Sequence, residues 1–150
     1  MEVFRIAREK YASSLTSSGT ANRWNIKGQQ VLYAGSSRSL ASLELIVHKG
    51  AVQPVLAYKV MVISIADDDY LTRQIQIKDL PADWRSLTAY PILQNIGAAW
   101  YNSQASLVLK IPSAVNPAEH NYMINTEHPD FIKKVKLVRT EDYFWDSRLL

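Results

Sequence analysis

The sequence predicts one α+β domain built on a mixed, largely antiparallel sheet with few helices. Its 150 residues are the usual size of a single domain and can bury a real core. Short apolar runs rich in β-branched residues are separated by glycine, proline and small polar residues, which is typical of strands joined by turns. Only two longer segments have helical spacing. No repeat, linker or low-complexity tract divides the chain, so residues 1–150 are expected to form one domain.

Six apolar runs predict the strands of this sheet. The strongest is Val55–Ile65, because it is long and rich in β-branched residues. The Ser/Thr-rich stretch 11–19 predicts an exposed loop, Leu80–Trp84 a turn into a short helix or a buried aromatic anchor, and Pro129–Lys133 a single helical turn. The predicted strands are Val3–Ile6, Val31–Ala34, Val55–Ile65, Ser106–Ile111, Tyr122–Ile124 and Val135–Val138.

The two helical segments differ in how they begin. The first runs from Leu40 through Val47, with Ser36 or Ser37 as its N-cap and Gly50 closing it. The second, Pro91–Asn102, begins with a proline, which the first turn of a helix tolerates. Its apolar face is expected to carry Ile92, Ile96, Ala99 and Trp100.

The composition excludes several classes of protein. The chain has no cysteine, so it has no disulfide, thiol nucleophile or cysteine zinc site, and a cytoplasmic location is expected. The N-terminal segment lacks the apolar core of a signal peptide, and no run is long enough to span a membrane. A net charge of +3 is too small to indicate nucleic-acid binding. The basic residues at 133, 134, 136 and 139 alternate with apolar ones and predict the solvated face of a strand.

Familiar catalytic and metal-binding motifs are missing from the sequence. It contains no glycine-rich loop of the Rossmann or P-loop form, no HExxH and no GxSxG. The three histidines, His48, His120 and His128, are far apart, which favours structural or exposed roles over metal ligation. The aspartates at 67–69 lack the spacing of a calcium loop and predict a solvated turn. No metal site is therefore expected.

One carboxylate in the first helix has an unusual position. Counted along the helix, the residues at 40, 41, 43, 45 and 47 form an apolar arc, and Glu44 projects into its middle. Because an unpaired buried carboxylate is costly, Glu44 should have a partner or a task. The alternative is a rotated helix that lets Glu44 reach the surface. The pattern alone leaves these two interpretations equal.

A set of polar residues at the predicted strand and helix edges suggests a nucleotide site. Arginine suits bidentate phosphate recognition, tyrosine can stack on a flat ring, and a carboxylate can stabilise a cationic transition state. Together these groups fit cleavage of an N-glycosidic bond in a pyrophosphate-bearing nucleotide. The candidates are Arg5, Arg23, Tyr33, Ser36, Glu44, Ser113 and Asn121.

Each candidate also has a structural explanation. Arg23 could form a surface cation–π pair with Trp24, Tyr33 could be a core aromatic, and Ser113 a turn residue at a strand end. Taken singly, these structural explanations are the stronger ones.

Seven blocks in order resemble a RES-domain protein, a family named for its arginine, glutamate and serine. The resemblance covers nearly the whole chain, and seven ordered blocks make it specific. The blocks are FRIA at 4–7, RWNIKGQQVLYAGSS at 23–37, LASLELIVH at 40–48, LPADW at 80–84, GAAWYNSQASLVLKIPSAV at 97–115, HNYMINTEHPDF at 120–131 and FWDSRL at 144–149.

The resemblance implies a toxin of a bacterial toxin–antitoxin pair, with a fold similar to that of ADP-ribosylating toxins. Such a protein would use NAD⁺ as its substrate, without a metal, and split nicotinamide from ADP-ribose by hydrolysis or phosphorolysis. By position, the family's catalytic residues fall on Arg23, Tyr33, Glu44 and Ser113, and a further nucleotide-site arginine on Arg5. Ser36 and Asn121 are expected to join Arg5 in binding NAD⁺.

The resemblance also implies a partner, an antitoxin with an Xre-like helix-turn-helix that blocks the active site in a hetero-oligomeric complex. Three other functions are weighed against NAD⁺ cleavage. A protein ADP-ribosyltransferase would use the same pocket, and the sequence does not distinguish the acceptor. A non-catalytic binding domain is disfavoured because all four catalytic residue types are present, and an RNase because the chain lacks a basic–aromatic stripe.

Overall fold

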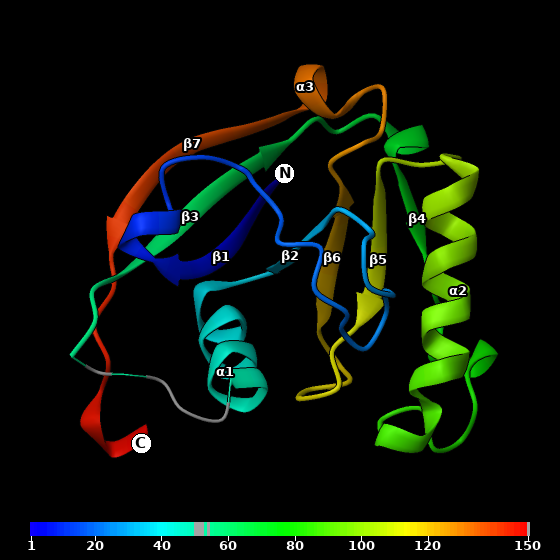
Figure 1. Cartoon of the computed structure of the whole chain (residues 1–150), viewed down its shortest axis with the longest axis horizontal. Helices are drawn as coiled ribbons and strands as arrows, with labels where there is room; N and C mark the ends of the chain where they lie inside the picture. The colour runs from blue at the N-terminus through cyan, green and yellow to red at the C-terminus, as the bar shows by residue number, and fades with distance from the viewer. Residues whose placement is uncertain (50–52, 54, 150) are drawn as a thin grey trace.

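A single seven-stranded sheet forms the centre of the molecule, with α1 and α2 packed against it (Figure 1). The structure is a computed structural model, and it describes residues 1–49, 53 and 55–149. The strand order is β4-β5-β6-β2-β1-β3-β7, and within the described residues only β4 and β5 pair in parallel. The predicted α+β class with a mixed, mostly antiparallel sheet is therefore confirmed.

Within the described residues the chain forms seven strands, three α-helices and five short 3₁₀ turns. The strands are β1 (Glu2–Arg8), β2 (Val31–Gly35), β3 (Tyr58–Ile65), β4 (Thr72–Gln74), β5 (Val108–Pro112), β6 (His120–Asn125) and β7 (Val135–Asp142). The α-helices are α1 (Arg38–Lys49), α2 (Tyr90–Ser103) and α3 (Phe131–Lys134). Short 3₁₀ turns lie at Glu9–Tyr11, Asp69–Leu71, Ile77–Asp79, Leu87–Ala89 and Ser147–Leu149.

Strand pairing moves several of the predicted boundaries. The strand predicted from Val55 begins at Tyr58, because the backbone N–H of Leu56 bonds the carbonyl of Gln53 in a turn. β7 continues to Asp142, since it pairs with β3 along its whole length. β4 was not predicted: its sequence, TRQ, has no apolar pattern, and its pairing with β5 makes it a strand.

Two loop predictions fit the structure. Asp67 accepts a hydrogen bond from the N-terminal amine at 2.8 Å, and Asp68 pairs with Lys134 at 2.9 Å, as suits a solvated acidic turn. Trp84 is buried, with 5% of its surface exposed, and so is the predicted aromatic anchor. It lies in a turn, and a 3₁₀ segment follows only at Leu87–Ala89.

The first helix buries a narrower face than its apolar arc predicts. Leu40, Ala41 and Leu45 are buried, the last two in a cluster with residues of β1 and β3, but Leu43 and Val47 are 40% and 61% exposed. The arc was too wide because α1 packs against β1 and β2 with only its inner side. The Ser37 hydroxyl accepts a hydrogen bond from the backbone N–H of residue 40, which confirms the N-cap, and Gly50 lies outside the described residues.

The second helix is rotated by about one residue from the predicted face. Trp100 is buried and Ile96 is partly buried, as predicted, but Ile92 and Ala99 are exposed, and Leu93 and Gly97 are buried instead. Leu93 and Trp100 belong to the cluster that includes residues 109, 111 and 123 of β5 and β6. The apolar spacing did not predict this rotation, because α2 also packs against the segment that precedes β2. None of the described helices is long and apolar enough to cross a membrane.

Candidate active site

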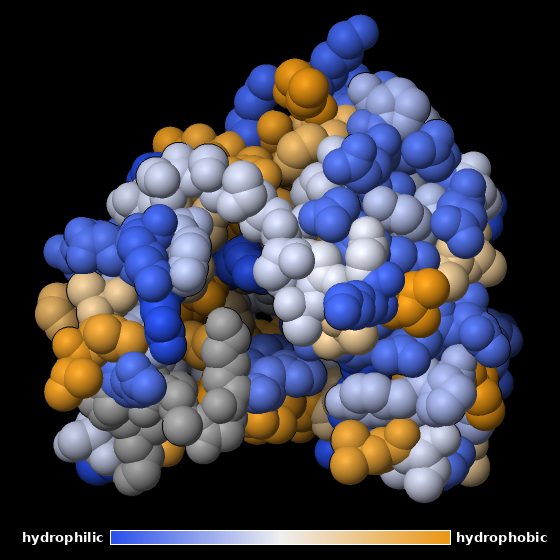
Figure 2. Space-filling view, in the orientation of Figure 1, coloured by the Kyte–Doolittle hydropathy of each residue, from blue (hydrophilic) through white to orange (hydrophobic). Residues whose placement is uncertain are grey.

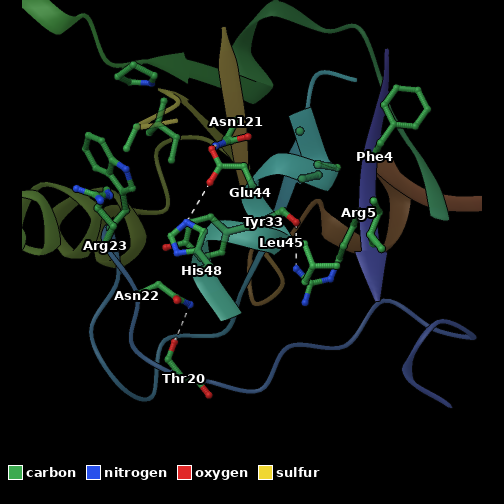
Figure 3. A pocket seen from close by; sticks show the side chains of 18 of the residues that line it. Phe4, Arg5, Thr20, Asn22, Arg23, Tyr33, Glu44, Leu45, His48 and Asn121 are labelled. Carbon is green, nitrogen blue, oxygen red and sulfur yellow. Dashed lines mark hydrogen bonds and ion pairs between the residues drawn. The ribbon is translucent and has the colours of Figure 1, made fainter. Parts of the chain in front are cut away.

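A pocket of about 290 Å³ lies between α1, the middle of β1, the end of β2, and the loop that precedes β2. The face drawn in Figure 2 is hollowed near its centre, and Figure 3 shows side chains converging on the pocket from several elements. The sequence candidates that line it are Arg5, Arg23, Tyr33, Glu44 and Asn121. Segments far apart in the sequence therefore bring five of the seven candidates together.

Glu44 reaches the pocket from α1 and is held by three neighbouring side chains. Its Oε1 accepts hydrogen bonds of 2.6 Å from the Ser113 hydroxyl and of 2.6 Å from the Asn121 amide. Its Oε2 lies 3.0 Å from Nε2 of His48, and Figure 3 shows Asn121 and His48 beside the carboxylate. The side chain is 15% exposed. The carboxylate is thus neither unpaired nor turned to the surface, and it has partners on both oxygens.

This environment controls the ionisation of Glu44. Desolvation by burial raises the pKa of the carboxyl, but the hydrogen bonds from His48, Ser113 and Asn121 lower it by more, so the net pKa lies below the ordinary 4.5. Hydrogen bonds donated to a carboxylate favour its charged form. Glu44 is therefore an anion at neutral pH.

Ser113 donates a hydrogen bond to Glu44 without itself lining the pocket. It is fully buried at the end of β5, and its hydroxyl oxygen accepts the backbone N–H groups of Val115 and Asn116, both at 3.1 Å. With its lone pairs used in this way, the hydroxyl proton points at Glu44. Ser113 is both the strand-end turn residue and the partner of the carboxylate.

Replacing Ser113 with alanine is expected to raise the pKa of Glu44. The change removes one of the hydrogen bonds that lower this pKa and leaves the desolvation in place. Because the wild-type pKa lies below its unfolded value, Glu44 adds stability above about pH 4.5 that is lost as the pH falls through the folded pKa. In Ser113→Ala that contribution is lost at a higher pH.

The measurement is a ¹³C NMR titration of the Glu44 carboxyl in both proteins. Ser42→Ala is the control. Ser42 lies on the same helix as Glu44, but its hydroxyl donates to the carbonyl of Arg38 and not to the Glu44 carboxylate. An unchanged Glu44 pKa in Ser113→Ala would contradict the conclusion that the Ser113 hydrogen bond lowers this pKa.

Arg5 is a half-buried cation that lines the pocket. β1 and β2 pair only at Phe4 and Gly35 within the described chain, which leaves the Tyr33 carbonyl free to accept a hydrogen bond of 3.0 Å from the Arg5 guanidinium. Desolvation lowers the pKa of Arg5. Among the described residues no carboxylate pairs with it, so an anionic ligand would supply the missing partner.

Arg23 enters the pocket from the loop before β2. One guanidinium nitrogen donates to the carbonyls of Trp84 and Arg85, at 3.3 and 2.9 Å, and Nε is buried without a partner among the described residues. The guanidinium lies 4.8 Å from the ring centre of Tyr90. The cation–π partner is therefore Tyr90, and the alternative of a surface pair with Trp24 is wrong, since Trp24 is buried.

Tyr33 lies on β2 between the pocket and the core. Its hydroxyl donates to the side-chain oxygen of Asn25, and burial raises the pKa of this tyrosine. Its ring packs against the cluster beneath α2 while it lines the pocket. Tyr33 is thus both a packed aromatic and a pocket residue.

Two residues depart from the sequence-based picture of the site. Ser36 is exposed and is not among the pocket residues, so its role in nucleotide binding stays a prediction. His48 is exposed, as expected, but it also lines the pocket and contacts Glu44, which the sequence did not predict. The spacing of Glu44 and His48, four residues apart on one helix, was the signal that could have identified it. No cluster of three or more His, Cys, Asp or Glu suited to a metal occurs within the described residues.

The chain is similar in sequence to a protein family and to several named toxins. The RES domain family matches residues 2–146. A protein named Toxin Res from Yersinia enterocolitica is 35% identical over 99% of both chains. A Prs ADP-ribosylating toxin from a Sphingobium species is 32% identical over 96% of this chain and 91% of its own.

A solved structure has a similar fold. It is the crystal structure of the M. tuberculosis MbcT–MbcA toxin–antitoxin complex, with a TM-score of 0.73 at 15% identity, covering 95% of this chain and 84% of the solved one. At this identity the likeness concerns the fold alone. From the match over residues 2–146 and the full-length similarity to the Yersinia protein, the chain belongs to the RES-domain family.

Proposed function

We propose that this protein is the toxin of a toxin–antitoxin pair and consumes NAD⁺ by cleaving its nicotinamide–ribose bond. The observation that carries the proposal is the pairing of opposite charges around one pocket. An ionised carboxylate, Glu44, lines it together with two guanidinium groups, Arg5 and Arg23, that have no acidic partner among the described residues. A dinucleotide with an anionic pyrophosphate and a cationic pyridinium ring complements this arrangement.

The chemistry needs an anion close to the ribose. As the bond between ribose C1′ and the pyridinium nitrogen breaks, its electron pair leaves with nicotinamide, and positive charge spreads over the ribose ring, as in glycoside cleavage. Glu44 would stabilise that charge or bind a ribose hydroxyl. Water then adds at C1′ and releases a proton, which yields ADP-ribose, or phosphate adds in its place. Nicotinamide leaves neutral, so no general acid is required.

The other pocket residues have supporting roles in this proposal. Arg5 and Arg23 would hold the pyrophosphate, and the ring of Tyr33 would pack against nicotinamide or its ribose. Asn121 and His48 would keep the carboxylate oriented, together with the buried Ser113. These roles agree with the observed contacts, because Ser113, Asn121 and His48 each contact a carboxylate oxygen of Glu44.

Transfer of ADP-ribose to a protein is the second candidate. It is favoured by the 32% identical relative that is named a Prs ADP-ribosylating toxin. The bond cleaved would be the same, and a nucleophilic protein group would replace water at C1′. We further propose a cytoplasmic antitoxin partner with an Xre-like helix-turn-helix that covers the pocket, because the solved relative is a toxin–antitoxin complex.

The test is proton NMR of NAD⁺ incubated with purified, antitoxin-free protein, with and without phosphate. Release of nicotinamide is expected. Free ADP-ribose would identify hydrolysis, and a phosphorylated sugar that forms only with added phosphate would identify phosphorolysis. If NAD⁺ stays intact, cell lysate and labelled NAD⁺ are added. Label on a protein would then favour the second candidate, and intact NAD⁺ even with lysate would contradict the proposed function.

A further inference from the structure

The segment that carries Arg23 has little regular structure of its own. Between the exposed loop and β2, residues 21–30 contain turns and an isolated bridge, in which the backbone N–H of Asn22 donates to the carbonyl of Asn25 at 3.0 Å. A segment without helix or strand is held in place by its own turn hydrogen bonds together with whatever packs against it. The placement of Arg23 therefore depends in part on contacts from outside its own loop.

One stripe of α2 supplies that packing. Tyr90, Gln94, Gly97 and Tyr101 are spaced by four, three and four residues, so they follow one another along a single side of the helix. All four meet the segment 22–30. This stripe adjoins the side of α2 that carries residues 93 and 100, and Trp24 and Tyr101 pack in the same cluster as those two residues.

The contacts of the stripe are specific and close. The Gln94 amide donates to the Asn22 carbonyl at 2.8 Å. A Cβ at Gly97 would lie 1.7 Å from the carbonyl oxygen of Trp24, so only glycine lets the loop approach the helix this closely. The two residues that α2 contacts in this way, Asn22 and Trp24, are the immediate neighbours of Arg23 in the sequence. At the ends of the stripe, the Tyr90 ring faces the Arg23 guanidinium and the Tyr101 hydroxyl accepts the backbone N–H of residue 30.

We propose that Gln94 and Gly97 are positioning residues that hold Arg23 at the pocket by fixing the backbone on each side of it. Gln94 binds the residue before Arg23, and Gly97 makes room for the residue after it. Neither residue lines the pocket, so both act through Arg23. The effect on NAD⁺ rests on the proposed function, whereas the effect on the placement of Arg23 does not.

The first test reads the placement of Arg23 directly. Nε of Arg23 is buried without a partner among the described residues, so its ¹H–¹⁵N cross-peak reports on its surroundings and can be assigned by its loss in Arg23→Lys. Gln94→Ala is expected to shift this cross-peak. Asn95→Ala is the matched control, because Asn95 is the exposed neighbour on the same helix. An unmoved cross-peak in Gln94→Ala would overturn the proposal.

The second test is a double-mutant cycle on NAD⁺ turnover. Gln94→Ala is expected to raise KM about threefold with kcat unchanged, the size of one ordinary hydrogen bond. In the Arg23→Ala background the same change should leave KM as it is, because the group it positions is gone. An equal rise in both backgrounds would mean a general structural role and would overturn the proposal.

Gly97→Ala should have the larger effect of the two, since the added methyl collides with backbone rather than with a flexible side chain. Its thermal midpoint is measured beside its KM, and Gln94→Ala decides the outcome if Gly97→Ala does not fold. If the wild-type protein leaves NAD⁺ intact, the proposed function fails, and the Arg23 cross-peak still decides the positioning claim.

Discussion

Glu44→Gln is expected to lower kcat for NAD⁺ cleavage by about 10²- to 10³-fold, the usual loss when one electrostatic stabiliser of a transition state is removed. Glutamine has the shape of glutamate, and its side-chain oxygen can still accept the hydrogen bonds from Ser113 and Asn121. What it lacks is the negative charge that offsets the cationic ribose. The loss should therefore fall on kcat, with KM little changed.

The measurement is steady-state nicotinamide release, with a thermal unfolding curve for each protein. Glu127→Gln is the control, because it removes an exposed carboxylate elsewhere on the surface and should leave kcat as in wild type. Full activity in a normally folded Glu44→Gln protein would mean that another group stabilises the transition state.

Arg5→Met is expected to weaken NAD⁺ binding without destabilising the fold. Hydrogen bonds to a charged group contribute about 1.5–3 kcal/mol, so losing the pyrophosphate partner should raise KM roughly 10- to 100-fold. In the free protein the Arg5 guanidinium donates to the Tyr33 carbonyl and pairs with no carboxylate among the described residues, and desolvation lowers its pKa. Methionine removes the cost of burying that charge and fills similar space.

The thermal midpoint of Arg5→Met should therefore equal or exceed that of the wild type, while its KM rises. A rise in KM without a loss of stability is typical of a binding residue that destabilises the protein when no ligand is bound. Arg8→Met is the matched control, since it makes the same change farther along β1 at a residue that does not line the pocket, and it should alter neither quantity. A midpoint several degrees below wild type with an unchanged KM would make Arg5 a structural residue.

Local signals were sufficient for much of the architecture. Runs of β-branched residues predicted the central strands, and a serine and a proline predicted the helix starts. A buried aromatic anchor was one of the two alternatives for Leu80–Trp84, and the burial of Trp84 favours it. These features depend on interactions between near neighbours, which a sequence pattern contains. β4 was missed for the same reason: a short polar strand exists only through pairing with β5, far along the chain.

The site itself shows where local reasoning ends. The apolar arc of α1 predicted that Glu44 needed a partner but left open whether it was buried. Its partners come from β5's end, from β6 and from its own helix, and only the sheet order places Ser113 and Asn121 beside it. His48 could have been found from its spacing, since a helix brings residues four apart onto one side.

The sequence by itself determined the fold class, the family and the residue types that make an NAD⁺ site chemically reasonable. The tertiary structure alone decided which of those residues meet. It also decided that Ser113 donates a hydrogen bond to the Glu44 carboxylate, and that a stripe of α2 contacts the backbone on both sides of Arg23. The physical reason is that helix and strand patterns arise from neighbours in the chain. Burial, charge pairing and the placement of a loop arise from contacts between segments that only the folded sheet brings together.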